Sequence, residues 1–118
     1  MIALYTEHVK SIGIDHMKRI LDSGENYRIV DVRSRQEFDK EHIKGALSLP
    51  MDEIDKKASG TLRTDDKIIT YCDSFVCSSS TSAAKMLNRM GFKDVRDYKG
   101  GLREWKQAGN PTEGTQVH

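Results

Sequence analysis

Two cysteines stand in a short polar stretch of the chain, Cys72-Asp-Ser-Phe-Val-Cys77, and five hydroxyl residues, Ser78–Ser82, follow it directly. The nucleophilic form of a cysteine is the thiolate, so a feature that lowers the pKa of the thiol raises its reactivity at neutral pH. The free N–H groups and positive dipole end of a helix N-terminus favour an anion, and such a setting lowers a thiol pKa from about 8.5 to roughly 3.5–7.5. A strand that delivers Cys72 to the start of a helix would therefore make it a nucleophile.

The residues around the cysteines predict such a strand and such a helix. Lys67–Cys72 is apolar and β-branched, which predicts a buried strand, and a loop follows from Asp73 to Ser79. Apolar residues then recur on one helix face, namely Ala83, Met86, Leu87 and Met90. Gly91 is expected to end this helix. One of four hydroxyls is expected to cap its start, from Ser78, Ser79, Ser80 and Thr81. Free cysteines are also among the most buried residues, so Cys72 and Cys77 have a purely structural interpretation as well.

The rest of the chain alternates between helical and strand patterns. These predict, in chain order, a helix over Ile14–Leu21 stopped at Ser23-Gly24, a strand over Tyr27–Arg33 ending at or shortly after Asp31, a helical turn at Ser34–Phe38 with Glu37 in a capping box, a strand over Ala46–Leu49 closed by Pro50, a helix over Asp52–Ala58 ended by Gly60, a strand over Val95–Tyr98, and a short helix beginning with Leu102 and Trp105. The polar segment after Asn110 is expected to be frayed. This alternation predicts an α/β domain with a mostly parallel sheet, in which ligands bind at the carboxyl ends of strands.

The composition fits one domain and disfavours several classes of function. A chain of 118 residues leaves no room for two domains. Lys and Arg number 19 against 18 Asp and Glu, a formal charge of +1, so no basic surface for nucleic acid or an anionic membrane is expected. No apolar run reaches membrane-spanning length, and Met1–Lys10 lacks the pattern of a signal peptide. We therefore expect a cytoplasmic protein, in which two cysteines rarely form a structural disulfide.

Four stretches of the chain stand in a recognisable order and at recognisable separations. They are Asp31-Val-Arg33-Ser-Arg-Gln-Glu37-Phe38 with His42-Ile43-Lys-Gly45-Ala46-Leu-Ser-Leu-Pro50, then Tyr71-Cys72, then Ser80-Thr-Ser-Ala83-Ala84-Lys-Met-Leu87, and finally Gly91-Phe92-Lys-Asp-Val95 with Tyr98-Lys-Gly100-Gly101-Leu-Arg-Glu-Trp105. Together, from Ile12 to Gly109, they resemble the single-domain rhodanese-like sulfurtransferase family. The resemblance implies a three-layer α/β fold with a mostly parallel central sheet flanked by helices on both faces. It also implies a single domain over residues 1–118, with its core at about 12–109 and a polar tail at 110–118.

The resemblance further implies a sulfur transfer in two steps. Cys72 would attack the outer sulfur of thiosulfate, 3-mercaptopyruvate or a protein persulfide, and would carry that sulfur as a persulfide until a thiol acceptor or cyanide removes it. Backbone N–H groups of the loop would hold the anionic persulfide, in the way that an oxyanion hole holds its oxygen. The loop consists of Asp73, Ser74, Phe75, Val76, Cys77 and Ser78. No metal or organic cofactor is needed, and the expected partners are a small sulfur donor or a persulfide-carrying protein and a thiol acceptor.

The loop departs from the family pattern in charge and in length. Many members have a shorter loop with glycine and with an Arg just before the serine that matches Ser80, whereas here Ser79 takes the Arg position and the loop is longer. The loop therefore lacks the cation that would bind an anionic donor, and Asp73 adds a negative charge, which disfavours thiosulfate. The loop also holds a second sulfur. We expect that Cys77 could attack a persulfide on Cys72, forming a disulfide and releasing sulfide.

Residues outside the loop are candidates for auxiliary roles. In the family, residues at the positions of Asp31 and Arg33 mainly tie loops together, and a buried Asp–Arg pair suits that role, although Arg33 could also lend positive charge to the pocket. His42 is expected to form a hydrogen bond in a turn, with a general base as the alternative. Phe75 is either an exposed lid over the nucleophile or an anchor tucked inward. Three glycines are expected to supply positive φ or close packing, namely Gly45, Gly100 and Gly101.

Other functions fit the residues less well. The main alternative is a non-catalytic or redox-sensing rhodanese-like binding domain that uses the Cys72/Cys77 pair. Phosphatase or arsenate-reductase chemistry needs an Arg shortly after the cysteine, and residues 73–84 contain none. A structural zinc site needs four ligands, which two cysteines and scattered histidines do not supply at the usual spacing. The sequence leaves the oligomeric state open.

Overall fold

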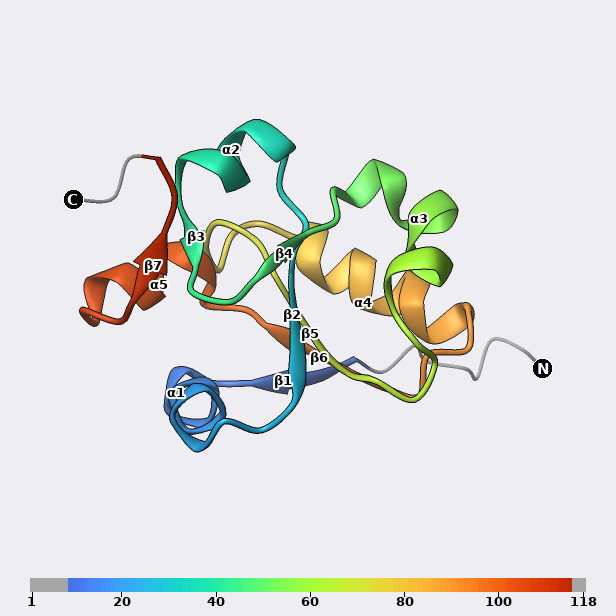
Figure 1. The fold of residues 1–118 in the computed structure, drawn as a ribbon, viewed down its shortest axis with the longest axis horizontal. Helices are drawn as coiled ribbons and strands as arrows, with labels where there is room; N and C mark the ends of the chain where they lie inside the picture. Colours follow the sequence, from blue (N-terminus) through green and yellow to red (C-terminus); the bar gives the residue numbers. More distant parts are fainter. Residues whose placement is uncertain (1–8, 116–118) are drawn as a thin grey trace.

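A five-stranded parallel sheet forms the middle layer of the fold (Figure 1). The computed structural model describes residues 9–115. In order across the sheet, the strands are β1 (Lys10–Ile12), β6 (Asp94–Tyr98), β5 (Lys67–Tyr71), β2 (Tyr27–Asp31) and β4 (Leu47–Ser48). Every neighbouring pair is parallel, so all the carboxyl ends lie at one edge of the sheet and β5 lies at its centre.

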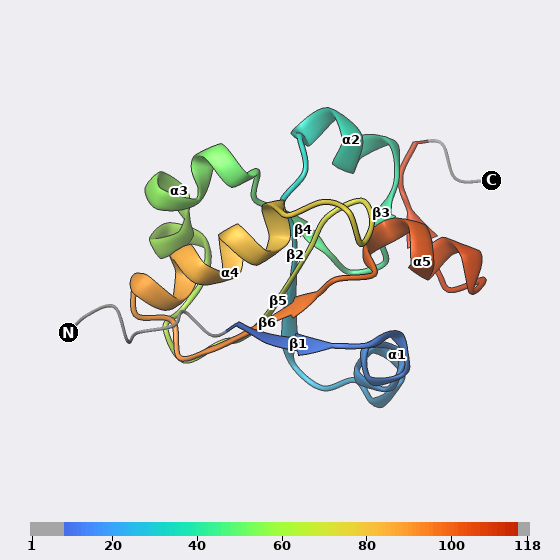
Figure 2. The same ribbon diagram turned by 180° about the vertical axis from the view of Figure 1, so that it is seen from behind.

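Helices cover both faces of this sheet, as the sequence predicted (Figure 2). Helices α3 (Ile54–Thr61) and α4 (Ser79–Arg89) pack on one face, and α1 (Ile14–Ser23) and α5 (Gly101–Gln107) pack on the other. The short helix α2 (Arg35–Lys40) and the 3-10 turn η2 (Met51–Glu53) lie in the connections around β4. A small antiparallel pair, β3 (His42–Ile43) and β7 (Thr112–Glu113), stands beside α5.

Alternate side chains of β5 divide the core between the two faces. Ile68 and, one residue beyond the strand, Cys72 belong to the apolar cluster under α3 and α4. Ile69 and Tyr71 belong to the cluster under α1 and α5, which also holds the fully buried Trp105. This division follows from the twofold alternation of side chains along a strand. Because both faces are covered, the central strand β5 is buried at every position after Lys67.

Local sequence signals fix the ends of two helices. Gly24 has a φ of 73° and ends α1, as the predicted Ser23-Gly24 stop requires. The Ser34 hydroxyl accepts a hydrogen bond from the Glu37 N–H at 3.2 Å and caps α2. The Glu37 carboxylate accepts a hydrogen bond from the Ser34 hydroxyl at 3.4 Å. The two side chains that the capping box predicts are therefore in contact at the start of α2.

The structure corrects two of the sequence predictions for this fold. The tail was expected to be frayed after Asn110, yet Thr112–Glu113 pairs as β7 with His42–Ile43. Gly60 was expected to end a helix, yet it lies inside α3, which continues to Thr61. The sequence also gave no signal for β1 and β3, which have three and two residues. Such short strands are stabilised by partners that are distant in the chain, so local patterns do not show them.

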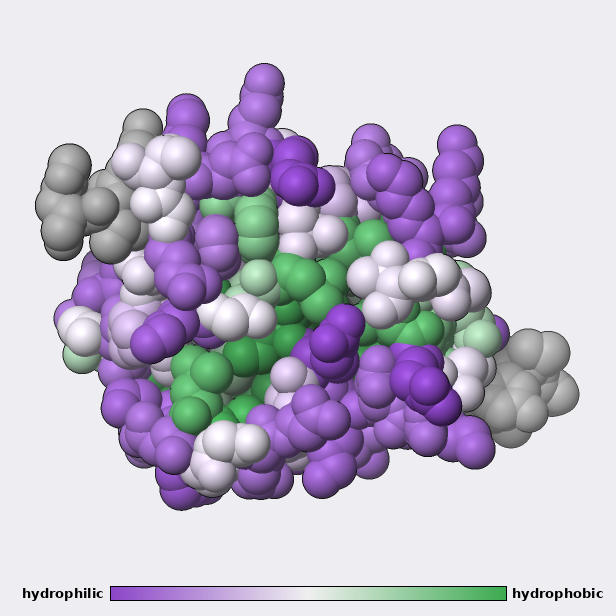
Figure 3. Space-filling view, viewed as in Figure 1, coloured by the Kyte–Doolittle hydropathy of each residue, from purple (hydrophilic) through white to green (hydrophobic). Residues whose placement is uncertain are grey.

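The face seen in Figure 1 carries apolar surface around the edge strand β4. Figure 3 shows this area in the middle of the face, ringed by hydrophilic side chains. Leu47 of β4 and Met51 beside it are only partly buried, and both pack against the cluster under α3 and α4. Over residues 9–115, none of the helices is long and apolar enough to cross a membrane. Most of the N-terminal segment examined for a signal peptide, residues 1–8, lies outside the described residues, as do residues 116–118.

Candidate functional site

The two cysteines of the loop form a disulfide in this structure. Cys72 directly follows the central strand β5, and Cys77 lies one residue before the N-cap of α4, Ser78. The Cα atoms of the two cysteines are 6.3 Å apart. The side chains differ in their surroundings, because Cys72 is only 5% exposed and lies within the apolar core, whereas Cys77 is half-buried. The strand–loop–helix arrangement predicted around Cys72 is therefore present, with the loop in its oxidised form.

Helix α5 forms backbone hydrogen bonds with the first residues of the loop. The Leu102 N–H donates to the Cys72 carbonyl at 3.0 Å, and the Arg103 N–H donates to the Asp73 carbonyl at 2.8 Å. Gly101 permits this approach, since its φ is 67° and a Cβ atom there would lie 2.6 Å from the Cys72 carbonyl oxygen. The predicted close packing at Gly101 is thus explained by the backbone of the cysteine loop.

The loop leaves most of its backbone N–H groups free of backbone partners. Within residues 73–78, the Cys77 N–H donates to the Ser74 carbonyl at 3.1 Å, and it is the only one of these N–H groups with a backbone acceptor among the described residues. The prediction that a hydroxyl caps α4 is wrong, because the side chain of the N-cap residue Ser78 forms no capping hydrogen bond. The Thr81 hydroxyl, in the first turn of α4, instead donates to the Asp97 carboxylate at 2.5 Å. The free N–H groups in the first turn of α4 are therefore not satisfied by a side-chain cap.

A buried ion pair lies beside the loop and ties several segments together. Arg33 donates from Nε and Nη2 to the fully buried carboxylate of Asp31, at 3.1 and 2.9 Å. The same guanidinium donates from Nη2 to the Glu41 carbonyl at 2.6 Å and from Nη1 to the Asp73 carboxylate at 3.1 Å. Tyr71 donates its hydroxyl to Asp31 at 2.6 Å and accepts the Ile43 N–H at 3.0 Å. The negative charge of Asp73 is therefore paired, and the positive charge of Arg33 is shared between two carboxylates.

The electrostatics of this network agree with its geometry. Burial alone would lower the pKa of Arg33, but the hydrogen bonds and charge of Asp31 outweigh it and raise that pKa above its ordinary value. Burial raises the pKa of Tyr71 well above its ordinary value, and the neighbouring charge of Asp31 raises it further. Arg33 is therefore a permanent cation and Tyr71 a permanent hydrogen-bond donor at neutral pH.

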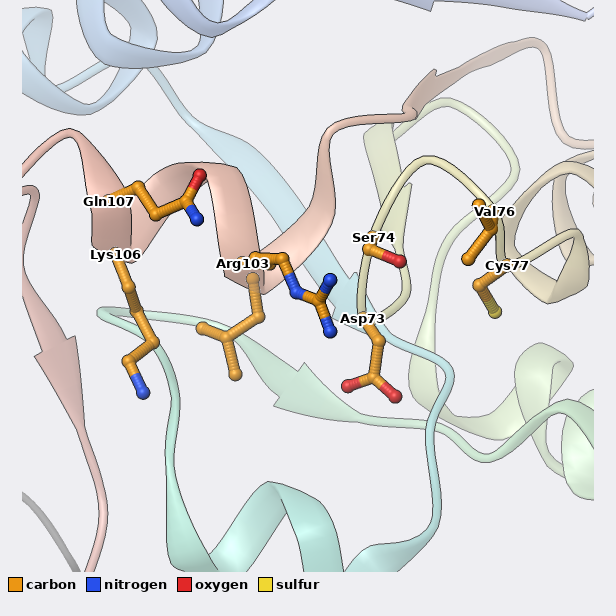
Figure 4. A pocket seen from close by; sticks show the side chains of 8 residues that line it. Asp73, Ser74, Val76, Cys77, Arg103, Lys106 and Gln107 are labelled. Carbon is orange, nitrogen blue, oxygen red and sulfur yellow. The ribbon is translucent and has the colours of Figure 1, made fainter.

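A cavity of about 600 Å³ opens between the cysteine loop and α5 (Figure 4). Its lining residues are Asp73, Ser74, Val76, Cys77, Leu102, Arg103, Lys106 and Gln107. Figure 4 shows the two groups facing each other, with the loop on one side and α5 on the other. Sequence reasoning found the loop residues but missed Arg103, Lys106 and Gln107. Their spacing at i, i+3 and i+4 places them on one helix face, a signal that the sequence did contain.

The remaining predicted residues have distinct positions. Phe75 is 59% exposed and Val76 is 93% exposed, so of the two alternatives for Phe75 the structure excludes an anchor tucked inward. The sequence predicts His42 in a turn, but in the structure it begins β3. Its Nδ1 lies 2.6 Å from the Phe38 carbonyl oxygen, and its ring stacks on the Phe38 ring. Gly45 has the predicted positive φ, at 86°. Gly100 has a φ of −61°, but a Cβ atom there would overlap the Glu104 side chain, so close packing is the alternative that holds for Gly100. Among residues 9–115, no three His, Cys, Asp or Glu side chains gather as a metal site would require.

The fold and the site define a class of protein: an α/β domain that carries a cysteine at the carboxyl edge of a parallel sheet, directly before a helix. A family model described as the rhodanese-like domain matches residues 14–108. The solution structure of the rhodanese-like domain of Alr3790 from Anabaena superposes with a TM-score of 0.83 at 32% identity, over 92% of this chain and 82% of that one. This chain belongs to the rhodanese-like family.

Relatives with descriptive names point to sulfur transfer at the level of the family. The thiosulfate sulfurtransferase GlpE of Coxiella burnetii is 36% identical over 84 residues, which are 71% of this chain and 75% of GlpE. YrkF of Bacillus subtilis, named as a candidate sulfur carrier protein, is 34% identical over 97 residues, which are 82% of this chain. The match covers only 51% of YrkF, so this chain spans about half the length of that relative.

Proposed function

We propose that this protein is a sulfurtransferase that carries a sulfane sulfur as a persulfide on Cys72. The observation that supports this most directly is the position of Cys72 at the carboxyl end of the central strand, in a loop that enters α4. In the reduced protein, the Cys72 thiolate attacks the outer sulfur of a donor, which forms the persulfide S–S bond and breaks the donor's bond to that sulfur. A thiol acceptor then takes the sulfur, and the Cys72 thiolate returns.

The loop backbone is suited to hold the anionic persulfide. The N–H groups of Asp73, Ser74, Phe75, Val76 and Ser78 have no backbone acceptor among the described residues, so they are available to an anion. The backbone is fixed from behind, since α5 holds the carbonyls of Cys72 and Asp73. Preorganised donors of this kind stabilise charge without having to reorganise during the reaction.

The cations that a sulfur donor would meet come from α5 in this proposal. The loop has none of its own, which disfavoured thiosulfate when the sequence alone was considered. Arg103 and Lys106 line the cavity that the loop shares with α5. Small anionic compounds such as thiosulfate and 3-mercaptopyruvate are therefore candidate sulfur donors. A persulfide-carrying protein is the other candidate donor, and the likeness to YrkF supports a place in a sulfur relay.

Cys77 gives the persulfide a second fate. Its thiolate attacks Sγ of Cys72 in the persulfide, which forms the Cys72–Cys77 disulfide and releases hydrosulfide as the leaving group. The disulfide seen in this structure is the product that this step would leave. It also supports the second candidate function, a redox-sensing domain in which the cysteine pair is the sensor.

The mass of the intact protein tests the proposal. Protein that has been fully reduced and freed of reductant is incubated with thiosulfate, or with a cysteine desulfurase and cysteine, alongside Cys72→Ser and Cys77→Ser. We expect one added sulfur atom in wild type and in Cys77→Ser, reversed by reductant, and none in Cys72→Ser. Wild type should also proceed to a disulfide with release of sulfide, and Cys77→Ser should not. Absence of added sulfur with both donors, together with reversible disulfide formation, would favour the redox-sensing function instead.

A further inference from the structure

We propose that the cavity between the loop and α5 binds a small thiol bearing a carboxylate or another anionic group, and that this thiol reduces the Cys72–Cys77 disulfide by attacking Sγ of Cys77. The inference deepens the proposed function, because it states how the oxidised loop would be returned to the form in which Cys72 is free. Reduction at the cavity does not itself require sulfur transfer, so the two can be tested separately.

The surroundings of the two sulfurs decide which one an external thiol attacks. Access is one of the factors that set the rate of thiol–disulfide exchange. Cys77 lines the cavity and is half-buried, whereas Cys72 is 5% exposed, packs in the core under α3 and α4, and does not line the cavity. A thiolate in the cavity therefore meets Sγ of Cys77 and releases Cys72 as the leaving group.

The charges around the cavity favour an anion. Arg103 forms no ion pair or side-chain hydrogen bond with the residues of the described chain, so its guanidinium is available to a ligand. The second cation, Lys106, has its Nζ 2.6 Å from a carboxylate oxygen of Glu41. The one carboxylate of the lining, Asp73, is already paired with Arg33 at 3.1 Å. The cavity thus has one free positive charge and no free negative charge.

The size and the remaining lining residues set the kind of thiol. A volume of about 600 Å³ lies within the range of sites for small molecules. Val76 and Leu102 supply apolar surface for a short carbon chain, and Gln107 supplies an amide that can donate and accept hydrogen bonds. A guanidinium also suits a planar carboxylate, which it can bind in a bidentate fashion.

The reduction balances with two thiols and no other reactant. The first thiolate forms a bond to Sγ of Cys77 and breaks the Cys72–Cys77 bond, so that Cys72 leaves as a thiolate. A second thiolate attacks the sulfur of the first thiol in this mixed disulfide, which forms a free disulfide and releases the Cys77 thiolate. Two thiols are oxidised, and one protein disulfide is reduced.

The experiment measures how fast different thiols reduce the oxidised protein. We compare 3-mercaptopropionate, which is anionic, with 2-mercaptoethanol, which is neutral, and correct each rate for the thiolate fraction. The preference for the anionic thiol should be about fivefold smaller in Arg103→Gln than in wild type, because one partly exposed charge pair is lost. Arg63→Gln is the matched control, since it removes the same charge from an exposed side chain outside this cavity and should keep the preference of wild type.

Peptide mass mapping after an acid quench locates the mixed disulfide, which we expect on Cys77. A mixed disulfide on Cys72 would overturn the inference, and so would equal thiol preferences in wild type and Arg103→Gln. Persulfide loading of the pre-reduced protein is measured in parallel. If loading fails while the thiol preference depends on Arg103, the proposed sulfur transfer is wrong and the binding site stands. If loading succeeds while the preference does not depend on Arg103, the opposite holds.

Discussion

Replacing Gly101 with alanine tests how helix α5 positions the cysteine loop. Gly101 and Gly45 both have positive φ, at 67° and 86°, a conformation that costs an L-residue about 1–2 kcal/mol. Their surroundings differ. A Cβ atom at Gly101 would lie 2.6 Å from the Cys72 carbonyl oxygen, 2.7 Å from the Asp73 carbonyl carbon and 2.8 Å from the Ser74 nitrogen. A Cβ atom at Gly45 would meet nothing within 4 Å. Gly45→Ala is therefore a matched control that carries the backbone cost without the clash.

The magnitude follows from these two contributions. Gly45→Ala should lower the free energy of unfolding by about 1–2 kcal/mol, which is the cost of positive φ alone. Gly101→Ala should carry the same backbone cost and should lower the free energy of unfolding by about 1–3 kcal/mol more. This further loss comes from overpacking, because the atoms that must shift belong to the backbone. With a urea m-value of roughly 1–3 kcal/mol per molar, the two midpoints should differ by about 1 M. The clash lies at the loop, so persulfide loading of Cys72 should also slow in Gly101→Ala and remain normal in Gly45→Ala.

Urea unfolding followed by circular dichroism measures the stabilities. Both cysteines are kept reduced, so that the Cys72–Cys77 disulfide does not mask the difference in stability between the variants. Loading of Cys72 is followed by intact mass under native conditions. The packing of Gly101 against the loop would be refuted as a determinant of the site if the two variants had the same midpoint and the same loading rate. If Gly101→Ala were loaded slowly but had the same urea midpoint as Gly45→Ala, the loop would shift without lowering the stability of the fold.

Three further predictions concern the groups around the site. Asp31→Asn should destabilise the fold by about 3–5 kcal/mol, because it removes the charge that pairs with the buried Arg33, and in urea unfolding the double variant Asp31→Leu/Arg33→Leu should lose less than the single variant. The pKa values of Tyr71 and Tyr98 are raised in the folded protein, so above a pH of about 10 the unfolded chain loses protons that the folded one retains. The free energy of unfolding should then fall with rising pH, by up to about 1.4 kcal/mol per unit for each tyrosine, and Tyr71→Phe or Tyr98→Phe should reduce that slope; a flat profile would contradict the raised values. Ending the chain at Asn110 removes the Pro111 carbonyl that accepts the Trp105 Nε1–H at 2.8 Å, so a loss of about 1–3 kcal/mol and a change in tryptophan fluorescence are expected, and an unchanged spectrum would argue against this bond.

The sequence predicted the central elements of the fold because their signals are local. Tyr27–Asp31 and Lys67–Tyr71 are rich in β-branched residues, and α4 has apolar residues at helical spacing. β1 has two exposed residues in three and therefore shows no such pattern. β7 exists only because a distant segment, His42–Ile43, lies beside it. The expectation of a frayed tail failed for that reason, since composition says nothing about a partner far away in the chain.

The site divides in the same way. The cysteine loop could be predicted because its reactive residues are consecutive in the chain. Arg103 and Lys106 lie on a helix that follows a different strand, so only the topology brings them to Cys77. Arg103 and Lys106 could have been predicted from the strand order. β6 neighbours β5 in a parallel sheet, so the segment after β6 must begin beside the end of β5. The loop itself lacks cations, as the sequence shows, but the site does not, because α5 supplies Arg103 and Lys106.

The position of β5 has a consequence for how motion is distributed in the molecule. Its backbone is paired with β2 on one side and β6 on the other over all five residues, and helices cover both of its faces. Amide protons there should exchange with solvent only when the whole domain unfolds. Immediately beyond Tyr71, the loop has few backbone hydrogen bonds, so its amides should exchange far faster. Among residues 9–115, a boundary between slowly and rapidly exchanging amides thus falls at Cys72, where the rigid sheet ends and the proposed sulfur chemistry takes place.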